Sequence, residues 1–282
     1  MLSVNQAVTM VVILHNSYPH LSKIFDALAG IPVIAVDNAS TDQSVDVIRE
    51  SYPEVHLISN RLNQGYGRAI NQALAETTTP YMMVINPDLT ITQDAVQHLV
   101  NKAQQGFQNE WLLIAPNTGE TPKFLNTHRE DVEPRLSWAT GAAMFFQTRV
   151  LRELEGFDEA FFLFFEETDL CRRAVEQTFA IYYAEEVDIP HEAGQSAPVD
   201  DTIVRLKSWH YQWSRLYYLR KHRELFPLFK QYMKVQALYP IKLRWLKPKA
   251  KKRQDYELRL SATRAFLRGK GAFDGEGIPY RP

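Results

Sequence analysis

The chain has almost no cysteine, because Cys171 is the only one among its 282 residues. A single thiol can form neither an internal disulfide nor a cysteine-based zinc cluster, and this composition is typical of a reducing compartment. Long hydrophobic runs are absent too, since no apolar stretch approaches the roughly 18–20 residues that span a bilayer. The first residues carry no basic segment of the kind that begins a signal peptide. We therefore expect a cytoplasmic protein.

The chain also has little net charge: 32 Lys and Arg against 33 Asp and Glu give a formal value of -1. This balance is a cancellation: residues 1–204 hold 12 basic and 28 acidic side chains, whereas residues 205–270 hold 19 basic and 3 acidic ones. Such an asymmetry indicates an interaction surface in the basic part. With 45% hydrophobic and 23% charged residues, the composition is otherwise that of a globular protein, which excludes disorder and fibrous repeats.

The first 116 residues alternate between strand-like and helix-like segments. Short apolar runs are separated by segments that carry apolar residues at helical spacing. This alternation predicts an α/β domain with a parallel, doubly wound sheet. The runs that we expect to form strands are residues 8–14, 32–37, 55–60, 81–86 and 111–116.

After Pro116 the alternation stops. We expect residues 117–137 to form a polar loop, and residues 138–147 and 180–185 to form strands. A helix near residues 167–178 should lie between these two strands. From residue 201 onward the pattern is helical, basic and aromatic.

Polar motifs follow four of the predicted strands. Ligands of an open α/β sheet bind at the carboxyl ends of its strands, so these motifs are the first candidates for a binding site. A dinucleotide-binding protein would need Gly-x-Gly-x-x-Gly after the first strand. This chain has His15-Asn-Ser-Tyr-Pro there, which argues against NAD. The candidates are His15, Asn16, Asp37, Asn38, Asn63, Gly65, Tyr66, Gly67, Asn86 and Asp88.

Each motif on its own also has a purely structural explanation. Asp42 fits a turn and helix cap better than a ligand contact. Gly65 and Gly67 suit backbone turns as well as the close approach of a nucleotide. Asp88 is either a cap or a hard oxygen ligand for Mg²⁺ or Mn²⁺ beside a diphosphate. Asp37 is harder to explain structurally, because an acid that closes a buried strand packs poorly but can accept a hydrogen bond from a nucleobase imide or a ribose hydroxyl.

The densest cluster of carboxylates follows an aromatic run. Six apolar residues, 160–165, lead directly into Glu166, Glu167 and Asp169. An acidic first turn of a surface helix would account for these acids. However, a carboxylate that emerges from a buried segment has a raised pKa, as a general base requires. We therefore favour a catalytic role for this cluster.

Taken together, the motifs resemble family 2 glycosyltransferases of the GT-A fold, in the branch that contains bacterial rhamnosyltransferase-like enzymes. The resemblance covers residues 8–200, and the motifs occur in the order that the family shows. It implies an α/β fold with a Rossmann-like mixed sheet flanked by helices. The matching segments are VDNASTD (36–42), NQGYGRAIN (63–71), NPD (86–88), GAAMFF (141–146), GFDEAFFLFFEETDL (156–170) and HEAGQS (191–196).

The resemblance implies a donor site and a metal site. Asp37 would bind the uracil or thymine base of a nucleoside diphosphate sugar, with the other strand-end residues around the donor. Asp88 stands at the last position of the family's Asp-x-Asp-type metal motif, which is Asn-Pro-Asp here. His191 matches a histidine near the metal and the diphosphate. The implied cofactor is Mg²⁺ or Mn²⁺.

The resemblance also implies a general base and an acceptor site. The second position of the family's Glu-Asp pair falls on Glu167, and this chain has Glu where the family commonly has Asp. The choice among Glu166, Glu167 and Asp169 therefore stays open. The candidates for acceptor binding are Trp138, Gly141 and Ala142.

Inverting glycosyl transfer fits these residue types. A carboxylate takes the proton from the attacking hydroxyl, and a cation stabilises the departing diphosphate. The acidic residues 1–204 should repel a nucleotide sugar unless a divalent ion neutralises its diphosphate, so we predict metal dependence. The expected donor is deoxythymidine-diphosphate rhamnose, and the expected acceptor is a lipid-linked or polysaccharide glycan of the cell surface. The alternatives are a hexosyl or galactofuranosyl transferase with a uridine-diphosphate donor, a nucleotidyltransferase, and a non-catalytic protein that binds nucleotide sugars or glycans.

The basic part of the chain, residues 205–282, should be a helical extension of a catalytic domain formed by residues 1–204. Its aromatic residues either pack against that domain or serve a partner. Nucleic-acid binding is conceivable on charge alone, but no recognition motif accompanies it. An anionic membrane surface suits residues 205–270 better, with Trp and Tyr at the interface and Lys and Arg on lipid headgroups. This places the enzyme on the cytoplasmic face of the inner membrane. Arg215 is a further candidate for contact with the donor diphosphate.

Overall fold

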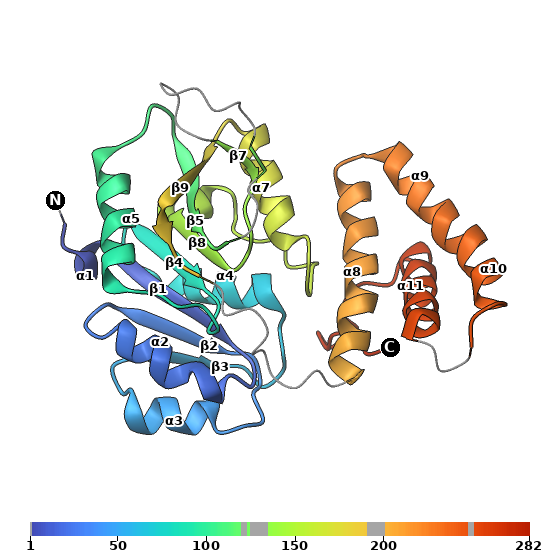
Figure 1. Cartoon of the computed structure of the whole chain (residues 1–282), viewed down its shortest axis with the longest axis horizontal. Helices are drawn as coiled ribbons and strands as arrows, with labels where there is room; N and C mark the ends of the chain where they lie inside the picture. The colour runs from blue at the N-terminus through green and yellow to red at the C-terminus, as the bar shows by residue number, and fades with distance from the viewer. Residues whose placement is uncertain (1, 120–122, 125–134, 191–200, 248–250) are drawn as a thin grey trace. The chain divides into compact units, whose positions relative to one another are not determined.

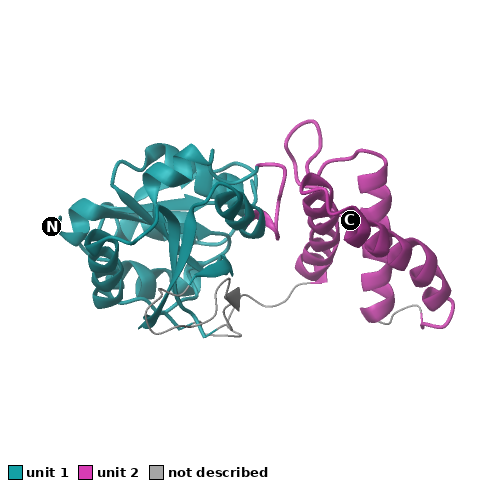
Figure 2. Ribbon diagram, turned by 90° about the horizontal axis from the view of Figure 1, so that it is seen from above, with its two compact units in different colours: residues 1–158, 167–197 teal, residues 159–166, 198–282 magenta. Residues whose placement is uncertain are grey.

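A computed structural model describes the chain except for residues 1, 120–122, 125–134, 191–200 and 248–250. The chain forms two compact units, which Figure 2 shows in different colours. The predicted boundary after residue 204 falls inside the first turn of helix α8 (Asp201–Lys221). The first unit comprises Met1–Asp158 and Glu167–Ala197, and the second comprises Glu159–Glu166 and Pro198–Pro282.

The first unit is built on one seven-stranded sheet. Its strands are β1 (Val8–Leu14), β2 (Val33–Asp37), β3 (His56–Ser59), β4 (Tyr81–Ile85), β5 (Trp111–Asn117), β8 (Ala143–Gln147) and β9 (Ala180–Asp188). The strand order is β3-β2-β1-β4-β8-β5-β9 (Figure 1). Neighbours run parallel, except that β8 is antiparallel to both β4 and β5. The predicted α/β fold with a mixed sheet and flanking helices is confirmed.

Helices cover both faces of this sheet. Alternate residues of β1 divide between two hydrophobic clusters: Met10 and Val12 belong to one, Val11 and Ile13 to the other. A strand whose two faces are both buried must be apolar at every position, which explains the continuous run at residues 8–14. The first cluster includes residues of α2 (Leu21–Ala27), α3 (Ser44–Ser51) and α5 (Gln93–Gln105), and the second includes residues of α4 (Tyr66–Glu76), α6 (Thr148–Glu153) and α7 (Glu166–Glu176).

Two expectations for the segment after residue 116 were wrong. Residues 117–137 are not all loop, because β7 (Leu136–Trp138) pairs with β6 (Lys123–Phe124). Residues 138–147 are not one strand either, since the chain leaves β7 at Trp138 and enters β8 only at Ala143. The local hydrophobic pattern does not predict that β8 inserts between β4 and β5, because strand order depends on pairing between distant segments.

The second unit is helical, as predicted. Its core is formed by α8 and α11 (Lys251–Leu267), with Trp209, Trp213 and Leu216 buried together with Phe266. Between them come α9 (Leu225–Met233), a π-helical turn (Lys234–Leu238) and α10 (Tyr239–Leu243). Within the described part of the chain, no helix is both long and apolar enough to cross a bilayer.

Candidate active site

The polar motifs after β1 and β2 meet the glycine motif before α4 around one side chain, Asn38. Register places Leu14 opposite Asp37, so the carboxyl ends of β1 and β2 coincide. The main-chain N–H of Asn38 donates to Leu14 O (2.8 Å), and its side-chain amide donates to Gly65 O (2.9 Å). The Nδ1 atom of His15 lies 2.9 Å from Asn38 O. The structure thus brings together three of the motifs that the sequence singled out.

Asp37 closes β2 with a carboxylate that is only 1% exposed. Its Oδ2 atom accepts a hydrogen bond from the Ser40 N–H (3.1 Å). Its Oδ1 atom is buried and has no hydrogen-bond partner within the described residues. A buried acceptor without a donor is costly and therefore rare. This oxygen has the properties expected of an atom whose donor comes from a ligand.

The loops after β1 and β2 hold each other in place. Asn16 has a φ of 53°; its main-chain N–H donates to Ser40 Oγ and its Oδ1 accepts from the Thr41 N–H, both at 2.8 Å. Asp42 accepts from the main-chain N–H groups of Tyr18 (3.1 Å) and Ser44 (3.0 Å). Although burial raises the pKa of Asp42, these hydrogen bonds outweigh it and lower the pKa. These contacts support the structural role that the sequence indicated for Asp42.

Different structural requirements explain why glycine stands before α4, at Gly65, and within α4, at Gly67. Gly65 caps the helix with a φ of 83°, a conformation that side chains disfavour. A Cβ atom on Gly67 would lie 3.0 Å from Phe157 Cβ, so this glycine permits close packing. Asn63 fixes the turn, because its Oδ1 atom accepts from the Gly65 N–H (2.9 Å). Gly65 thus belongs to the polar residues around Asn38 at the carboxyl ends of β1 and β2, here called the polar edge. Gly67, in contrast, is explained by packing in the core.

Sequence reasoning missed two residues of this edge. Asn60 follows β3 directly, and its side-chain amide donates to Asn38 Oδ1 (3.1 Å) and to Gln72 Oε1 (2.8 Å). Ser40 connects both loops, as described above. A broader form of the rule that pointed to Asp37, a polar side chain at the carboxyl end of a strand, would also have found Asn60, which directly follows β3.

Glu167 lies in the first turn of α7, half-buried among residues that we expected to bind the acceptor. The Trp138 side chain donates a hydrogen bond to its carboxylate. A Cβ atom on Gly141 would lie 4.0 Å from Glu167 Cγ and 3.5 Å from Tyr66 Cε1. Burial raises the pKa of Glu167, and hydrogen bonds from Trp138 and Thr168 offset part of this rise. A partly exposed carboxylate with a raised pKa has the properties of a general base.

A continuous chain of contacts joins this carboxylate to the polar edge. Asn38 holds Gly65 O, and the next residue, Tyr66, donates from its hydroxyl to Gly141 O (2.5 Å). Gly141 in turn lies against Glu167, as its Cβ distance shows. These contacts link the segment that carries Asp37 to the segment that carries Glu167 within the first unit.

Asp88 lies beyond the carboxyl end of β4 and is half-buried, with Oδ1 inaccessible to solvent. The same turn is tied to its surroundings by the Asn86 N–H, which donates to Ala142 O (2.9 Å), and by the Thr90 N–H, which donates to Pro190 O (3.1 Å). Ala142 is thereby placed beside the predicted metal motif. The described residues contain no group of three His, Cys, Asp or Glu side chains that could hold an ion. His191 lies outside the described residues.

The other two acids of the cluster differ from Glu167. Glu166 is buried (5% exposed) and is the first residue of α7. Asp169 is fully buried and forms an ion pair with Arg173 (Oδ2 to Nε, 2.8 Å). The Arg173 guanidinium also donates to Leu154 O (2.5 Å) and Gly156 O (2.6 Å). Asp169 and Arg173 thus fasten α7 to the turn after α6.

Arg215 is half-buried on α8, in the second unit. Its predicted contact with the donor diphosphate stays a prediction.

The contacts between Asp169, Arg173 and the turn after α6 lead to a prediction about stability. Arg173→Met should lower the free energy of unfolding by about 3–5 kcal/mol, because it removes the cation that neutralises the buried Asp169. Arg172→Met is the matched control. Its partner Glu176 is 55% exposed, so this pair should contribute less than about 1 kcal/mol. Urea denaturation of both variants measures the difference. Equal stability of the two variants would contradict this role of Arg173.

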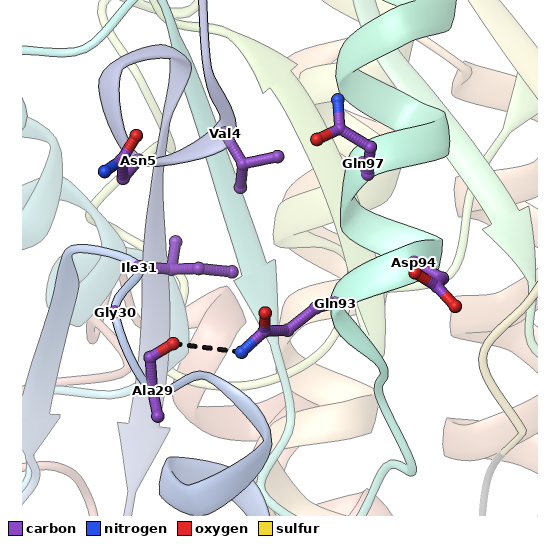
Figure 3. Close-up of a pocket in the computed structure, with 8 residues that line it drawn as sticks. All are labelled: Val4, Asn5, Ala29, Gly30, Ile31, Gln93, Asp94 and Gln97. Carbon is purple, nitrogen blue, oxygen red and sulfur yellow. Dashed lines mark hydrogen bonds between the residues drawn. The ribbon is translucent and has the colours of Figure 1, made fainter.

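A cavity of about 380 Å³ lies elsewhere in the first unit (Figure 3). Val4 and Asn5 precede β1, and Gly30 and Ile31 precede β2, so the cavity opens at the amino ends of these strands. The side-chain amide of Gln93 donates to Ala29 O (2.9 Å) within it. None of the predicted site residues lines this cavity, and its position is opposite to the carboxyl ends where they gather.

Comparison with known proteins shows the family of the chain. The model of the family described as "Glycosyl transferase family 2" matches residues 9–167. An N-acetylglucosaminyl-diphospho-decaprenol L-rhamnosyltransferase of Mycobacterium tuberculosis is 21% identical over 238 residues, covering 68% of this chain and 78% of that protein. A low-salt glycan biosynthesis hexosyltransferase of Haloferax volcanii is 23% identical over 222 residues, covering 69% of this chain and 68% of that protein.

Solved structures share the fold. A mannosyltransferase from Pyrobaculum calidifontis, in complex with GDP-Man and Mn²⁺, has a TM-score of 0.56 at 15% identity over 93% of this chain and 87% of its own. S. aureus TarS 1-349 in complex with UDP-GlcNAc has a TM-score of 0.55 at 15% identity over 94% of this chain and 92% of its own. At these identities the likeness shows the fold alone. Since the family match spans more than half of the residues, the chain belongs to glycosyl transferase family 2 and is a glycosyltransferase with the GT-A fold.

Proposed function

We propose that this glycosyltransferase inverts the configuration of the transferred sugar, depends on a divalent metal and moves L-rhamnose from deoxythymidine-diphosphate rhamnose to a lipid-linked acceptor. The reaction is supported by two carboxylates that a series of contacts links. Asp37 has a buried oxygen without a partner in the described residues, and Glu167 has a raised pKa. The sugar and the acceptor are supported by the name of the mycobacterial relative, an N-acetylglucosaminyl-diphospho-decaprenol L-rhamnosyltransferase. A lipid-linked acceptor places the enzyme at a membrane surface, on the cytoplasmic side.

A uridine-diphosphate hexose is the second candidate donor. The Haloferax relative is named a hexosyltransferase, and the TarS structure contains UDP-GlcNAc. Uracil and thymine both carry an imide N–H that can donate to a carboxylate, so Asp37 Oδ1 suits either base. Cytosine and adenine have no imide N–H, so cytidine and adenosine diphosphate sugars should bind more weakly. The polar edge therefore restricts the base more than the sugar.

Glu167 carries the proton transfer in the proposed reaction. Its carboxylate accepts the proton of an acceptor hydroxyl while the hydroxyl oxygen forms a bond with the anomeric carbon of the donor. The bond from that carbon to the diphosphate breaks, and the diphosphate leaves with the electron pair. Because the oxygen attacks from the face opposite the leaving group, the configuration inverts. Trp138 holds the Glu167 carboxylate in place through its hydrogen bond.

The donor set fits a divalent ion that arrives together with the diphosphate. Asp88 supplies a hard carboxylate oxygen, and Mg²⁺ or Mn²⁺ is commonly held by one or two carboxylates plus substrate phosphates. No cage of protein ligands is present within the described residues, which agrees with such shared coordination. The ion would neutralise the negative charge that the diphosphate gains as it leaves. His191 stays the predicted second protein ligand.

A panel of nucleotide sugars tests this proposal through thermal shift and calorimetry. With Mn²⁺, thymidine- and uridine-diphosphate sugars should raise the melting temperature, whereas cytidine-diphosphate sugars should have little effect. EDTA should weaken donor binding at least about tenfold, because the acidic surroundings then repel the diphosphate. Asp88→Ala should remove most of the Mn²⁺ effect, and Asp94→Ala, at an exposed position on α5, is the matched control. Undiminished donor affinity in EDTA would contradict metal dependence.

A further inference from the structure

The tryptophan and phenylalanine residues between 201 and 245 fall into two groups that divide near residue 225. Before it, Trp209 (0% exposed) and Trp213 (3%) are buried in the core of the unit. After it, Phe226 (76%), Phe229 (60%) and Trp245 (86%) are largely exposed. The predicted membrane role of residues 205–270 therefore does not suit the first group, whose surface is already used within the unit. Most of the exposed large apolar side chains of the second unit lie between Leu225 and Trp245; Val204, Leu267 and Tyr280 are the exposed ones outside this segment.

The exposed apolar residues of α9 lie on one side of the helix. Leu225, Phe226, Phe229 and Met233 are separated by the one-, three- and four-residue steps of a helical stripe. Leu228, in contrast, packs against the core of the unit. Helix α9 is thus apolar on both its inner and its outer side. Leu225 and Phe229 also line an apolar cavity with Leu216 and Phe266 of the core, yet both are more than half exposed. The exposed surface of the stripe therefore requires another explanation than folding.

The π-helical turn after α9 continues the stripe. In a regular α-helix, Leu238 would point to a different side from Met233, because the two are five residues apart. A π turn takes one residue more than an α turn, and the turn at Lys234–Leu238 spans this interval. Ile241 and Trp245 then extend the stripe at steps of three and four. Figure 1 shows α9 and α10 following one another along the chain as consecutive helices.

The charge of the segment indicates what covers this stripe. Residues 225–254 contain nine Lys and Arg and no Asp or Glu. Lys230, Lys234, Lys242 and Arg244 are exposed beside the apolar residues. A single-stranded nucleic acid would use aromatic rings and cations but not exposed Leu, Ile and Met side chains. Exposed aliphatic and aromatic residues flanked by cations match the interfacial helices that bind anionic bilayers.

We propose that the exposed apolar face of Leu225–Trp245, here called the docking face, inserts into the headgroup region of an anionic phospholipid bilayer. Its residues are Leu225, Phe226, Phe229, Met233, Leu238, Ile241 and Trp245. The proposal rests on the proposed function, because a lipid-linked acceptor presents its sugar at such a surface. It narrows the expected membrane contact from residues 205–270 to one face of α9, the π turn and α10.

Vesicle sedimentation of the full chain tests the docking face. The protein should pellet with vesicles of phosphatidylcholine and phosphatidylglycerol, and much less with phosphatidylcholine alone. The triple variant Phe226→Ser, Phe229→Ser, Trp245→Ser should lower the partition coefficient by at least about tenfold, because three large apolar side chains no longer enter the interface. Val204→Ser is the control, since Val204 is 45% exposed on α8, outside the docking face. Equal sedimentation of the triple variant and the control would overturn the proposal.

Tryptophan fluorescence gives a second, site-specific readout. Trp245 is 86% exposed, whereas Trp111, Trp209 and Trp213 are buried. Anionic vesicles should therefore shift the emission to shorter wavelength, and Trp245→Phe should abolish most of this shift. A shift that persists in Trp245→Phe would contradict insertion at this end of the face.

The outcome for docking is separable from the outcome for catalysis. Donor binding by calorimetry, without vesicles, should be the same in the triple variant and the unmodified chain. If the unmodified chain binds the donor but does not bind vesicles, the docking face alone is rejected. Vesicle binding without binding of any nucleotide sugar would reject the proposed function and leave the docking face supported.

Discussion

Glu167→Gln should lower kcat by about 10²–10⁴-fold, the range that a positioned general base contributes. Glutamine cannot take the acceptor proton, although its carbonyl oxygen can still accept the hydrogen bond from Trp138. Because Glu167 faces the predicted acceptor residues rather than the polar edge, the dissociation constant of the donor should stay within about twofold, far less than the loss of a charged hydrogen bond would cause. Steady-state kinetics and calorimetry on the same preparation measure both values.

Two other glutamates of α7 serve for comparison, one as a matched control and one as the alternative base. Glu176→Gln changes an exposed carboxylate at the other end of the helix and should leave kcat unchanged. Glu166→Gln tests the acid next to Glu167 directly. A loss of turnover in Glu166→Gln with full activity in Glu167→Gln would reassign the base.

The pH profile of the unmodified enzyme gives a further sign of the same carboxylate. The base acts in its ionised form, so kcat/KM should fall as the pH drops through its pKa. Since burial raises the pKa of Glu167, this fall should occur at a higher pH than the ordinary glutamate value of about 4.3. Trp138→Phe removes a hydrogen bond that lowers the pKa, so the fall should move to still higher pH. A profile that is the same in Trp138→Phe would contradict this contact.

Asp37→Asn should weaken donor binding by about 10–150-fold, the equivalent of losing a charged hydrogen bond worth roughly 1.5–3 kcal/mol. The Ser40 N–H requires an acceptor, so the amide oxygen of the new side chain should stay there. The amide NH₂ would then occupy the place of Oδ1 and face the imide N–H of the base, donor against donor. Calorimetry with deoxythymidine-diphosphate rhamnose and with a uridine-diphosphate hexose measures the effect.

A stability measurement separates a binding role of Asp37 from a structural one. The buried Oδ1 atom has no partner within the described residues, so removal of the charge should leave the free energy of unfolding unchanged or higher. Asp46→Asn, at an exposed position on α3, is the control for donor binding. Clear destabilisation by Asp37→Asn together with unchanged donor affinity would show that the carboxylate serves the fold.

Much of the first unit could be predicted from local pattern, because each strand buried on both faces carries a distinct apolar run. Residues 8–14 are predicted to the residue for this reason. The antiparallel β8 could not be predicted in its place between β4 and β5, since its pairing partners are distant in sequence. The same limit applies to the division of the chain, where residues 159–166 join the second unit although their neighbours belong to the first.

The site shows the same division between local and long-range information. The position of Asp37 at the end of a buried strand was sufficient to select it, and the structure adds that one of its oxygens has no donor in the described chain. The sequence left Glu166, Glu167 and Asp169 open because all three start the same helix. The structure distinguishes them by their contacts. Arg173, one helical turn further on, pairs with Asp169 and donates to the carbonyl groups of Leu154 and Gly156, whereas Trp138 and Gly141, which are distant in sequence, lie beside Glu167. These contacts favour Glu167 as the base.

The anomeric configuration of the product tests the central claim most directly. The reaction of the enzyme with Mn²⁺, deoxythymidine-diphosphate rhamnose or a uridine-diphosphate hexose, and a lipid diphosphate acceptor can be followed by NMR of the anomeric proton. A single catalytic carboxylate, Glu167, predicts a product whose anomeric configuration is opposite to that of the donor. Retention of the donor configuration, or no transfer from any nucleotide sugar, would contradict the account.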